Sequence, residues 1–128
     1  MTKEIKTLVI DDELAVLESF KMILGIKNYQ VTTARNLNEA AAAVSKEHFD
    51  IAFIDLRFEG REIGLDILKN IKEIDPKIEA VIVTAYATET TKIDALQLGA
   101  MDYISKPFMM EVIYELVDRA IEKNKAKR

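Results

Sequence analysis

Short apolar runs rich in β-branched residues alternate with segments of helical periodicity along the whole chain. The apolar runs predict strands at residues 7–10, 30–33, 51–54, 80–84 and 102–105. The helical segments are predicted at about 13–25, 37–47, 65–74, 89–98 and 109–124. Gly25, Pro76 and Gly99 follow three of these helices as stop signals, and Asp12 is a candidate cap for the first helix. No repeat or internal linker interrupts the alternation.

This alternation is typical of a doubly wound α/β fold, in which a five-stranded parallel sheet carries helices on both faces. The uninterrupted apolar runs fit strands that are buried on both sides. We therefore predict a single domain over residues 1–128, with a core at about 5–122 and a basic tail or linker start at 123–128. In such sheets ligands bind at the carboxyl ends of the strands.

The composition is that of an ordinary globular protein, with 49% hydrophobic and 31% charged residues among 128. A net charge of -4 argues against direct nucleic acid binding by this domain. The chain contains no cysteine, which excludes disulfides and thiol nucleophiles and is compatible with a reducing cytoplasm. The sequence also lacks the apolar segment of a signal peptide or a membrane span. We therefore expect a cytoplasmic protein without a membrane partner.

Polar side chains are predicted just beyond the strands, at the edge where ligands bind. Asp11 and Asp12 follow the first strand in the sequence LVIDDE, Asp55 follows the third, Thr84 ends the fourth and Lys106 follows the fifth. Each residue alone has a structural explanation, such as a helix cap or a surface cation. Together they place three carboxylates, a hydroxyl and an ammonium group on one rim, where a hard cation would offset the acids. The pattern predicts a Mg2+ site beside a nucleophilic Asp55 that forms an aspartyl phosphate.

Four motifs give the chain a resemblance to the receiver domains of two-component response regulators. They are VIDDE at 9–13, IAFIDLR at 51–57, VIVTAYA at 81–87 and GAMDYISKPF at 99–108. Each motif alone is a weak signal, but all four occur here in the order and spacing of that family. The resemblance implies a flavodoxin-like, CheY-like fold of strand order 2-1-3-4-5 with five helices. That order would place the first and third strands side by side.

The resemblance also implies a role for each acid. Asp55 corresponds to the phosphoacceptor, which is phosphorylated and dephosphorylated in Mg2+-dependent reactions that the domain itself catalyses without being a conventional enzyme. Asp12 and Asp55 correspond to direct Mg2+ ligands, the Arg57 backbone carbonyl to a third ligand, and Asp11 to a group acting through water. Arg57 and Tyr86 are bulky residues beside the site, and we expect them to slow hydrolysis of the phosphoryl group.

Thr84 and Lys106 correspond to residues that contact the phosphoryl group, and Tyr103 corresponds to an aromatic switch residue. The Lys106–Pro107 peptide bond is expected to be cis. Phosphorylation is expected to draw the Thr84 hydroxyl inward, so that the Tyr103 ring turns into the vacated space. The change would be displayed by the fourth helix, fifth strand and fifth helix, where the candidate contact residues are Lys92, Tyr103, Tyr114, Glu115 and Asp118.

His48 is the only histidine and is predicted to be exposed, so we expect the phosphodonor to be a separate sensor histidine kinase or phosphotransfer protein. The regulated partner is expected to be an output domain or a second copy of the chain. The segments ELVDRAIEKN and GAMDY are similar to those of NtrC-type regulators, which implies transcription control through an ATPase and DNA-binding portion. The loop LRFEGREIGL at 56–65 departs from the family because it has no proline and is one residue longer.

Three other classes of protein share parts of this pattern. A haloacid-dehalogenase-like phosphatase also forms an aspartyl phosphate, but its nucleophile follows the first strand in an Asp-x-Asp spacing, whereas this chain has Asp11-Asp12-Glu13-Leu14. A flavin or nucleotide binder of similar fold would need an anion-binding loop there, where these acids repel phosphate. A pseudo-receiver, serving purely as an interaction module, stays open as an alternative if the site residues do not bind Mg2+.

Overall fold

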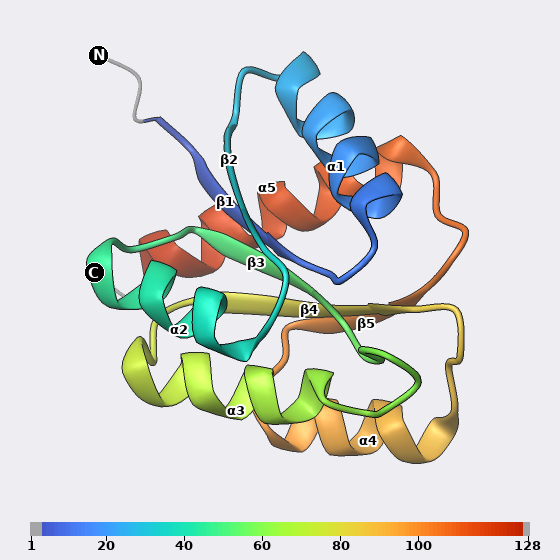
Figure 1. Ribbon diagram of the computed structural model, residues 1–128. Helices are drawn as coiled ribbons and strands as arrows, with labels where there is room; N and C mark the ends of the chain where they lie inside the picture. Colours follow the sequence, from blue (N-terminus) through green and yellow to red (C-terminus); the bar gives the residue numbers. More distant parts are fainter. Residues whose placement is uncertain (1–3, 127–128) are drawn as a thin grey trace.

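The computed structural model describes residues 4–126, which form one five-stranded parallel sheet covered by helices on both faces (Figure 1). The strands are β1 (Lys6–Ile10), β2 (Gln30–Ala34), β3 (Ile51–Asp55), β4 (Glu79–Thr84) and β5 (Asp102–Ser105). The helices are α1 (Leu14–Ile26), α2 (Leu37–Lys46), α3 (Gly64–Ile74), α4 (Glu89–Gln97) and α5 (Met110–Ala126). The strand order is β2-β1-β3-β4-β5. The predicted fold is confirmed, and each observed element lies within about two residues of its predicted bounds.

Two hydrophobic clusters lie on opposite faces of the sheet. Helices α1 and α5 cover one face, and α2, α3 and α4 cover the other (Figure 1). Successive side chains of a strand point to opposite faces, so Val9 packs with α1 and α5 while Leu8 and Ile10 pack under α2 and α3. This explains why the strand sequences are almost entirely apolar.

The register of the central strands brings the acids together. Ile10 of β1 is paired with Ile54 of β3, so Asp11 and Asp55, which directly follow them, lie next to each other. Asp55 is the last residue of β3 and is buried like the four residues before it. The chain leaves β1 toward β2 on one side and returns to β3 on the other, which makes the end of β1 and β3 the switch point where ligands bind.

Gly64 begins α3 at a point where two backbone segments touch. A Cβ atom there would overlap the carbonyl oxygen of Asp55 and the backbone of Leu56. The Gly64 N–H also donates to the Leu56 carbonyl oxygen at 2.8 Å. Only a glycine permits this approach, which holds the start of α3 against the end of β3.

The first helix differs from the prediction at both ends. Its N-cap position is Glu13, and no side chain caps it, so the prediction that Asp12 caps this helix is wrong. The carboxylate of Asp11 accepts the Glu13 N–H instead, at 2.9 Å. Gly25 lies inside α1, and the left-handed residue after the helix is Asn28, with a φ of 60°.

The fifth helix continues through most of the predicted basic tail and ends at Ala126. The last two residues of that tail, Lys127 and Arg128, lie outside the described residues. Within residues 4–126, none of the helices combines the length and the apolar character that crossing a membrane requires.

Candidate functional site

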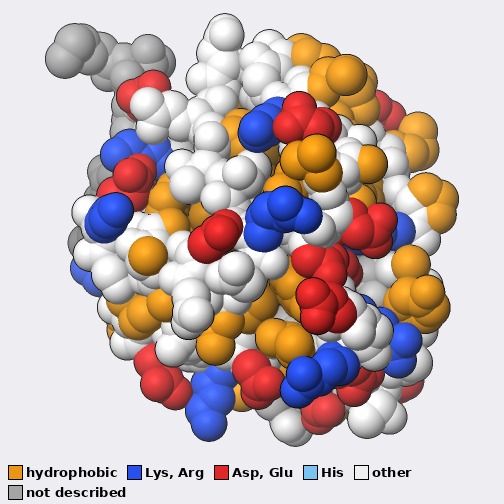
Figure 2. Space-filling model, viewed as in Figure 1, with side chains coloured by type: hydrophobic (Ala, Val, Ile, Leu, Met, Phe, Trp, Pro, Cys, Tyr) orange, Lys and Arg blue, Asp and Glu red, His pale blue; other side chains and the backbone are white. Residues whose placement is uncertain are grey.

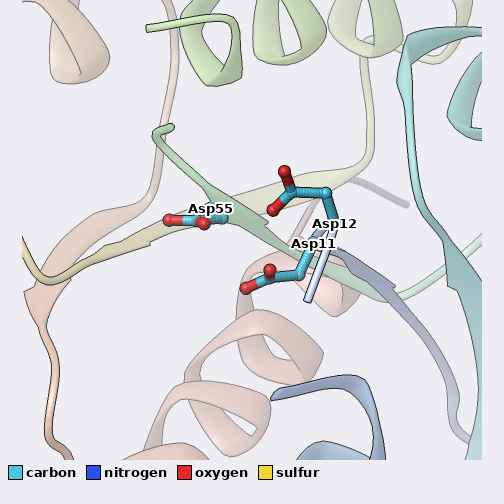
Figure 3. A group of neighbouring side chains, drawn as sticks. All are labelled: Asp11, Asp12 and Asp55. Atoms are coloured by element: carbon cyan, nitrogen blue, oxygen red, sulfur yellow. The ribbon is translucent and has the colours of Figure 1, made fainter. Parts of the chain in front are cut away.

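Three carboxylates meet at the carboxyl-terminal edge of the sheet. Asp11 and Asp12 come from the end of β1 and Asp55 from the end of β3, and their side chains face a common space (Figure 3). One oxygen from each lies within 4.8 Å of the others. Acidic side chains also gather on the molecular surface above the end of β1 (Figure 2). The structure therefore brings together the three acids that the sequence singled out.

Asp55 has an unusual electrostatic environment, because it is only 7% exposed and lies beside two other acids. Burial and the charge of Asp11 raise the pKa of Asp55 to about 6, although Lys106 and the Arg57 N–H favour its ionised form. A carboxylate in this setting gains stability from any cation placed next to it.

Lys106 lies between the two buried acids. Its Nζ is 3.1 Å from Asp11 Oδ2 and 3.7 Å from Asp55 Oδ1. Burial raises the pKa of Asp11, although the Glu13 N–H and the Lys106 ammonium favour its ionised form and partly offset this increase. The backbone of Lys106 donates to the Thr84 carbonyl oxygen at 2.8 Å, and the Lys106–Pro107 bond is cis, as the resemblance implies. One ammonium is thus shared by two of the three carboxylates, those of Asp11 and Asp55.

The chemistry of this donor set fits Mg2+, which prefers oxygen ligands and commonly binds one or two carboxylates together with water and phosphate oxygens. Within residues 4–126, the group formed by Asp11, Asp12 and Asp55 is the one that gathers three potential ligands in this way. The structural observation that supports a cation there is the convergence of three carboxylates, with one oxygen of each within 4.8 Å of the others.

Asp12 is held by two residues that the sequence did not indicate. Its Oδ2 accepts the backbone N–H of Glu59 at 2.9 Å, and its carbonyl oxygen accepts Nη2 of Arg35 at 3.0 Å. Glu59 belongs to the unusual loop between β3 and α3, and Arg35 follows β2. The one signal available in the sequence was the Glu59-Gly60 pair, because glycine often marks a tight turn.

Arg57 and Tyr86 stack on each other at the mouth of the site. The guanidinium carbon of Arg57 is 4.6 Å from the centre of the Tyr86 ring. Arg57 Nε is buried and has no hydrogen-bond partner among the described residues. Both residues border a pocket of about 250 Å3, which is lined by Asp12, Glu13, Asp55, Arg57, Glu59, Gly60, Ala85, Tyr86 and Lys106.

The two predicted switch residues are both buried. The Thr84 hydroxyl accepts the Tyr86 N–H at 3.0 Å. The Tyr103 hydroxyl lies 2.5 Å from the hydroxyl of Thr91 and accepts the Thr88 N–H at 3.3 Å. Tyr103 is only 9% exposed, so its predicted place among the surface contact residues is wrong for this conformation.

Two other predicted contact residues lie on a different side of α5. The Tyr114 hydroxyl donates to the Ile23 carbonyl oxygen of α1 at 2.7 Å, and Lys27 lies over the Tyr114 ring. Burial and the nearby charge of Asp118 raise the pKa of Tyr29, which precedes β2. The surface of α4, β5 and α5 therefore does not include Tyr114 and Asp118. Lys92 and Glu115 are exposed as predicted.

The side of α5 next to β5 carries a contact that the sequence analysis missed. Arg119 donates to Asp102 of β5 at 2.7 Å. Two apolar residues of α4, Ile93 and Leu96, are 47% and 44% exposed. These four residues replace Tyr114 and Asp118 as the features of this surface.

His48 is exposed, as predicted, and its Nδ1 is 2.6 Å from Asp75 Oδ2. It precedes β3, so it lies at the opposite end of the strand from Asp55. His48 is therefore not placed to donate a phosphoryl group to Asp55 within the same chain.

Comparisons with known proteins agree with this geometry. The family model described as "Response regulator receiver domain" matches residues 7–118. A solved CheY-like receiver domain protein from Methanospirillum hungatei superposes with a TM-score of 0.91 at 27% identity, covering 98% of this chain and 100% of that one.

Curated relatives include transcriptional regulators. The alginate biosynthesis transcriptional regulatory protein AlgB of Pseudomonas aeruginosa is 40% identical over 105 residues, which are 82% of this chain and 23% of AlgB. The DNA-binding transcriptional regulator NtrC of Salmonella typhimurium is 34% identical over 113 residues, 88% of this chain and 24% of NtrC. The chain thus spans about a quarter of the length of these relatives, and the predicted likeness to NtrC-type regulators is confirmed.

Proposed function

This chain belongs to the response regulator receiver domain family, and on that premise we propose that Asp55 accepts a phosphoryl group from a histidine kinase or a phosphotransfer protein. The observation that carries the proposal is the convergence of the buried Asp55 carboxylate, two further acids and the Lys106 ammonium at the switch point of the sheet. A carboxylate becomes a nucleophile when its neighbours position it and neutralise the charge of the incoming group.

In the proposed reaction, an Asp55 oxygen forms a bond to phosphorus while the bond from phosphorus to the donor nitrogen breaks, and its electron pair leaves with the imidazole. Lys106 is within 4 Å of Asp55 and can shift from Asp11 to a phosphoryl oxygen. The Thr84 hydroxyl, which here accepts the Tyr86 N–H, can donate its proton to another phosphoryl oxygen. These groups supply charge-assisted hydrogen bonds to the transferred group.

Mg2+ is the proposed cofactor, with Asp12, Asp55 and the Arg57 carbonyl as direct ligands and Asp11 acting through water. When bound, the ion supplies positive charge that stabilises the developing charge on the phosphoryl oxygens. The proposal is supported by the paired ends of β1 and β3, from which the Asp12 and Asp55 carboxylates face a common space.

The stacked Arg57 and Tyr86 side chains are proposed to lengthen the life of the phosphorylated form. They border the pocket above Asp55, where an attacking water must approach. The domain would catalyse its own phosphorylation and slow dephosphorylation and would not act as a conventional enzyme on a separate substrate.

The output is proposed to pass through Thr84 and Tyr103 to the surface of α4, β5 and α5, which would bind an output domain or a second copy of the chain. The relation to AlgB and NtrC supports transcription control as the output, with DNA binding supplied by a part other than this acidic domain. We place this activity in the cytoplasm, where histidine kinases present their phosphoryl groups.

The test uses acetyl phosphate with Mg2+ and intact-mass spectrometry. The parent chain should gain one phosphoryl group, and chelation of Mg2+ or Asp55→Asn should abolish the gain. Asp66→Asn, which changes an exposed acid in the first turn of α3, is the matched control and should be labelled normally. Equal labelling of Asp55→Asn would place the acceptor elsewhere. A parent chain that neither binds Mg2+ nor gains mass would be a pseudo-receiver.

A further inference from the structure

The loop between β3 and α3 forms a small hairpin. Phe58 and Arg61 pair as an antiparallel bridge, with hydrogen bonds of 2.8 and 3.0 Å in the two directions. The two residues at its tip, Glu59 and Gly60, have positive φ angles of 52° and 76°. Two-residue hairpin turns of this kind need left-handed backbone at both central positions. Glutamate adopts that conformation at a cost that a specific contact must offset.

Both ends of the hairpin are fixed to the domain. Phe58 is 5% exposed and belongs to the hydrophobic cluster under α2 and α3. After the hairpin, the Gly64 N–H is bonded to the Leu56 carbonyl oxygen. The hairpin therefore extends from β3 with Phe58 packed in the core and the following residue Gly64 bonded to Leu56, which limits the position of its tip.

That position places the Glu59 N–H 2.9 Å from Asp12 Oδ2, across 47 residues of sequence. One oxygen of the Asp12 carboxylate is thus fixed, which also fixes the direction of the other. Arg57, whose carbonyl is the third proposed ligand, directly precedes the hairpin. The same turn therefore controls the positions of two proposed ligands.

We propose that the hairpin formed by residues 58–61 is a positioning element for Mg2+, in which the Glu59 N–H orients the Asp12 carboxylate for metal binding. This inference rests on the proposed function, because it assumes that Asp12 is a Mg2+ ligand. Groups that hydrogen-bond to a metal ligand orient it, and their loss commonly lowers metal affinity by about 10- to 100-fold.

Two substitutions of Glu59 separate the effect of its backbone conformation from the effect of its side chain. Glu59→Gly and Glu59→Val remove the same charge, but glycine adopts a positive φ readily whereas a β-branched residue resists it. In calorimetric titration with MgCl2, we expect Glu59→Gly to bind like the parent and Glu59→Val to bind about tenfold more weakly. Equal dissociation constants for the two variants, or tighter binding by Glu59→Val, would overturn the proposal.

Gly60→Ala supplies a second variant, because its Cβ would meet nothing within 4 Å and only the backbone angle would be strained. It should also weaken Mg2+ binding, and it decides the question if Glu59→Val does not fold. In acetyl phosphate labelling, both strained variants should need more Mg2+ for half-maximal rate yet reach the parent rate at saturation. A lower saturated rate with unchanged Mg2+ dependence would show structural damage and would contradict positioning.

These results also separate the inference from the proposed function. If the parent binds Mg2+ but is not labelled on Asp55, the phosphoacceptor proposal fails while the role of the hairpin stands. If the parent is labelled and Glu59→Gly and Glu59→Val bind Mg2+ equally, only the role of the hairpin fails.

Discussion

The hydroxyl of Tyr103 on β5 is hydrogen-bonded to the hydroxyl of Thr91 on α4 at 2.5 Å. Thr91 in turn is bonded to Thr88, the residue that caps α4, through both its N–H and its hydroxyl. The inward position of Tyr103 is therefore tied to the first turn of α4. A displacement of the first turn of α4 and a rotation of the Tyr103 ring should therefore occur together.

Thr91→Val tests this coupling between Tyr103 and α4, because valine keeps the shape of threonine and removes the hydroxyl. We expect the variant to lose about 1 to 2 kcal/mol of stability, because the buried Tyr103 hydroxyl loses its closest partner. We also expect the Tyr103 ring to populate outward positions, which NMR of the ring would detect. Thr90→Val changes an exposed neighbour and should leave both properties unchanged. An unchanged Tyr103 ring in Thr91→Val would mean that Thr91 does not hold it.

Arg57 and Tyr86 should act as one unit in protecting the phosphoryl group, because their side chains are stacked. We expect Arg57→Ala and Tyr86→Ala each to increase the rate at which phosphate is lost from Asp55. The rate increase in the double variant should be smaller than the product of the two single increases. An exposed cation–π contact contributes about 0.5 to 1 kcal/mol, which corresponds to a coupling of about two- to fivefold in rate.

The rate is measured by following phosphorylated protein over time, with Arg61→Ala as a control for loss of a cation from the same loop. Independent effects of Arg57 and Tyr86 would contradict their action as a unit. Unchanged rates in Arg57→Ala, Tyr86→Ala and the double variant would contradict the proposal that these two residues lengthen the life of the phosphorylated form.

Stability in the presence of a chelator should depend on pH through Asp55. Its pKa is raised from 3.8 to about 6, mainly by burial, so the folded chain binds this proton more tightly than the unfolded chain. The contribution of Asp55 to stability therefore falls as pH rises from about 4 to above 6. Asp55→Asn should be more stable than the parent above pH 7, by roughly 3 kcal/mol, and should lose this advantage near pH 4.

Urea unfolding of the parent and Asp55→Asn across this pH range measures the difference directly. Asp66→Asn serves as the control, because that acid is exposed and is not one of the three acids that gather at the site. A difference between parent and Asp55→Asn that stays constant from pH 4 to pH 8 would contradict a raised pKa for Asp55.

Two glycines should respond to alanine in opposite directions. At Gly64 a Cβ would overlap the backbone of Asp55 and Leu56, so Gly64→Ala should destabilise the chain by about 1 to 3 kcal/mol. At Gly25, inside α1, a Cβ would meet nothing within 4 Å, so Gly25→Ala should stabilise it by about 0.5 to 1 kcal/mol. Thermal unfolding measures both. A neutral Gly64→Ala would mean that α3 can move away from β3.

The sequence by itself determined the fold and the identity of the acids. Hydrophobic periodicity reports directly which segments are strands and which are helices, and the parallel alternation requires the carboxyl ends of the strands to meet at one edge. Asp11, Asp12, Asp55 and Lys106 therefore had to lie close together once the strand order was known. The alternation of strands and helices follows from local pattern and general rules of chain topology, whereas the strand order came from the resemblance to receiver domains.

The tertiary structure decided which side chains meet across long stretches of sequence. Tyr114 and Asp118 were assigned to the wrong side of α5, because helical spacing shows which residues share a face and does not show which neighbour that face meets. The bond from Glu59 to Asp12 depends on two left-handed residues in a loop, and the stacking of Arg57 on Tyr86 depends on the packing of two separate loops. Contacts of this kind arise from the exact placement of backbone segments, and no periodic pattern in the sequence encodes that placement.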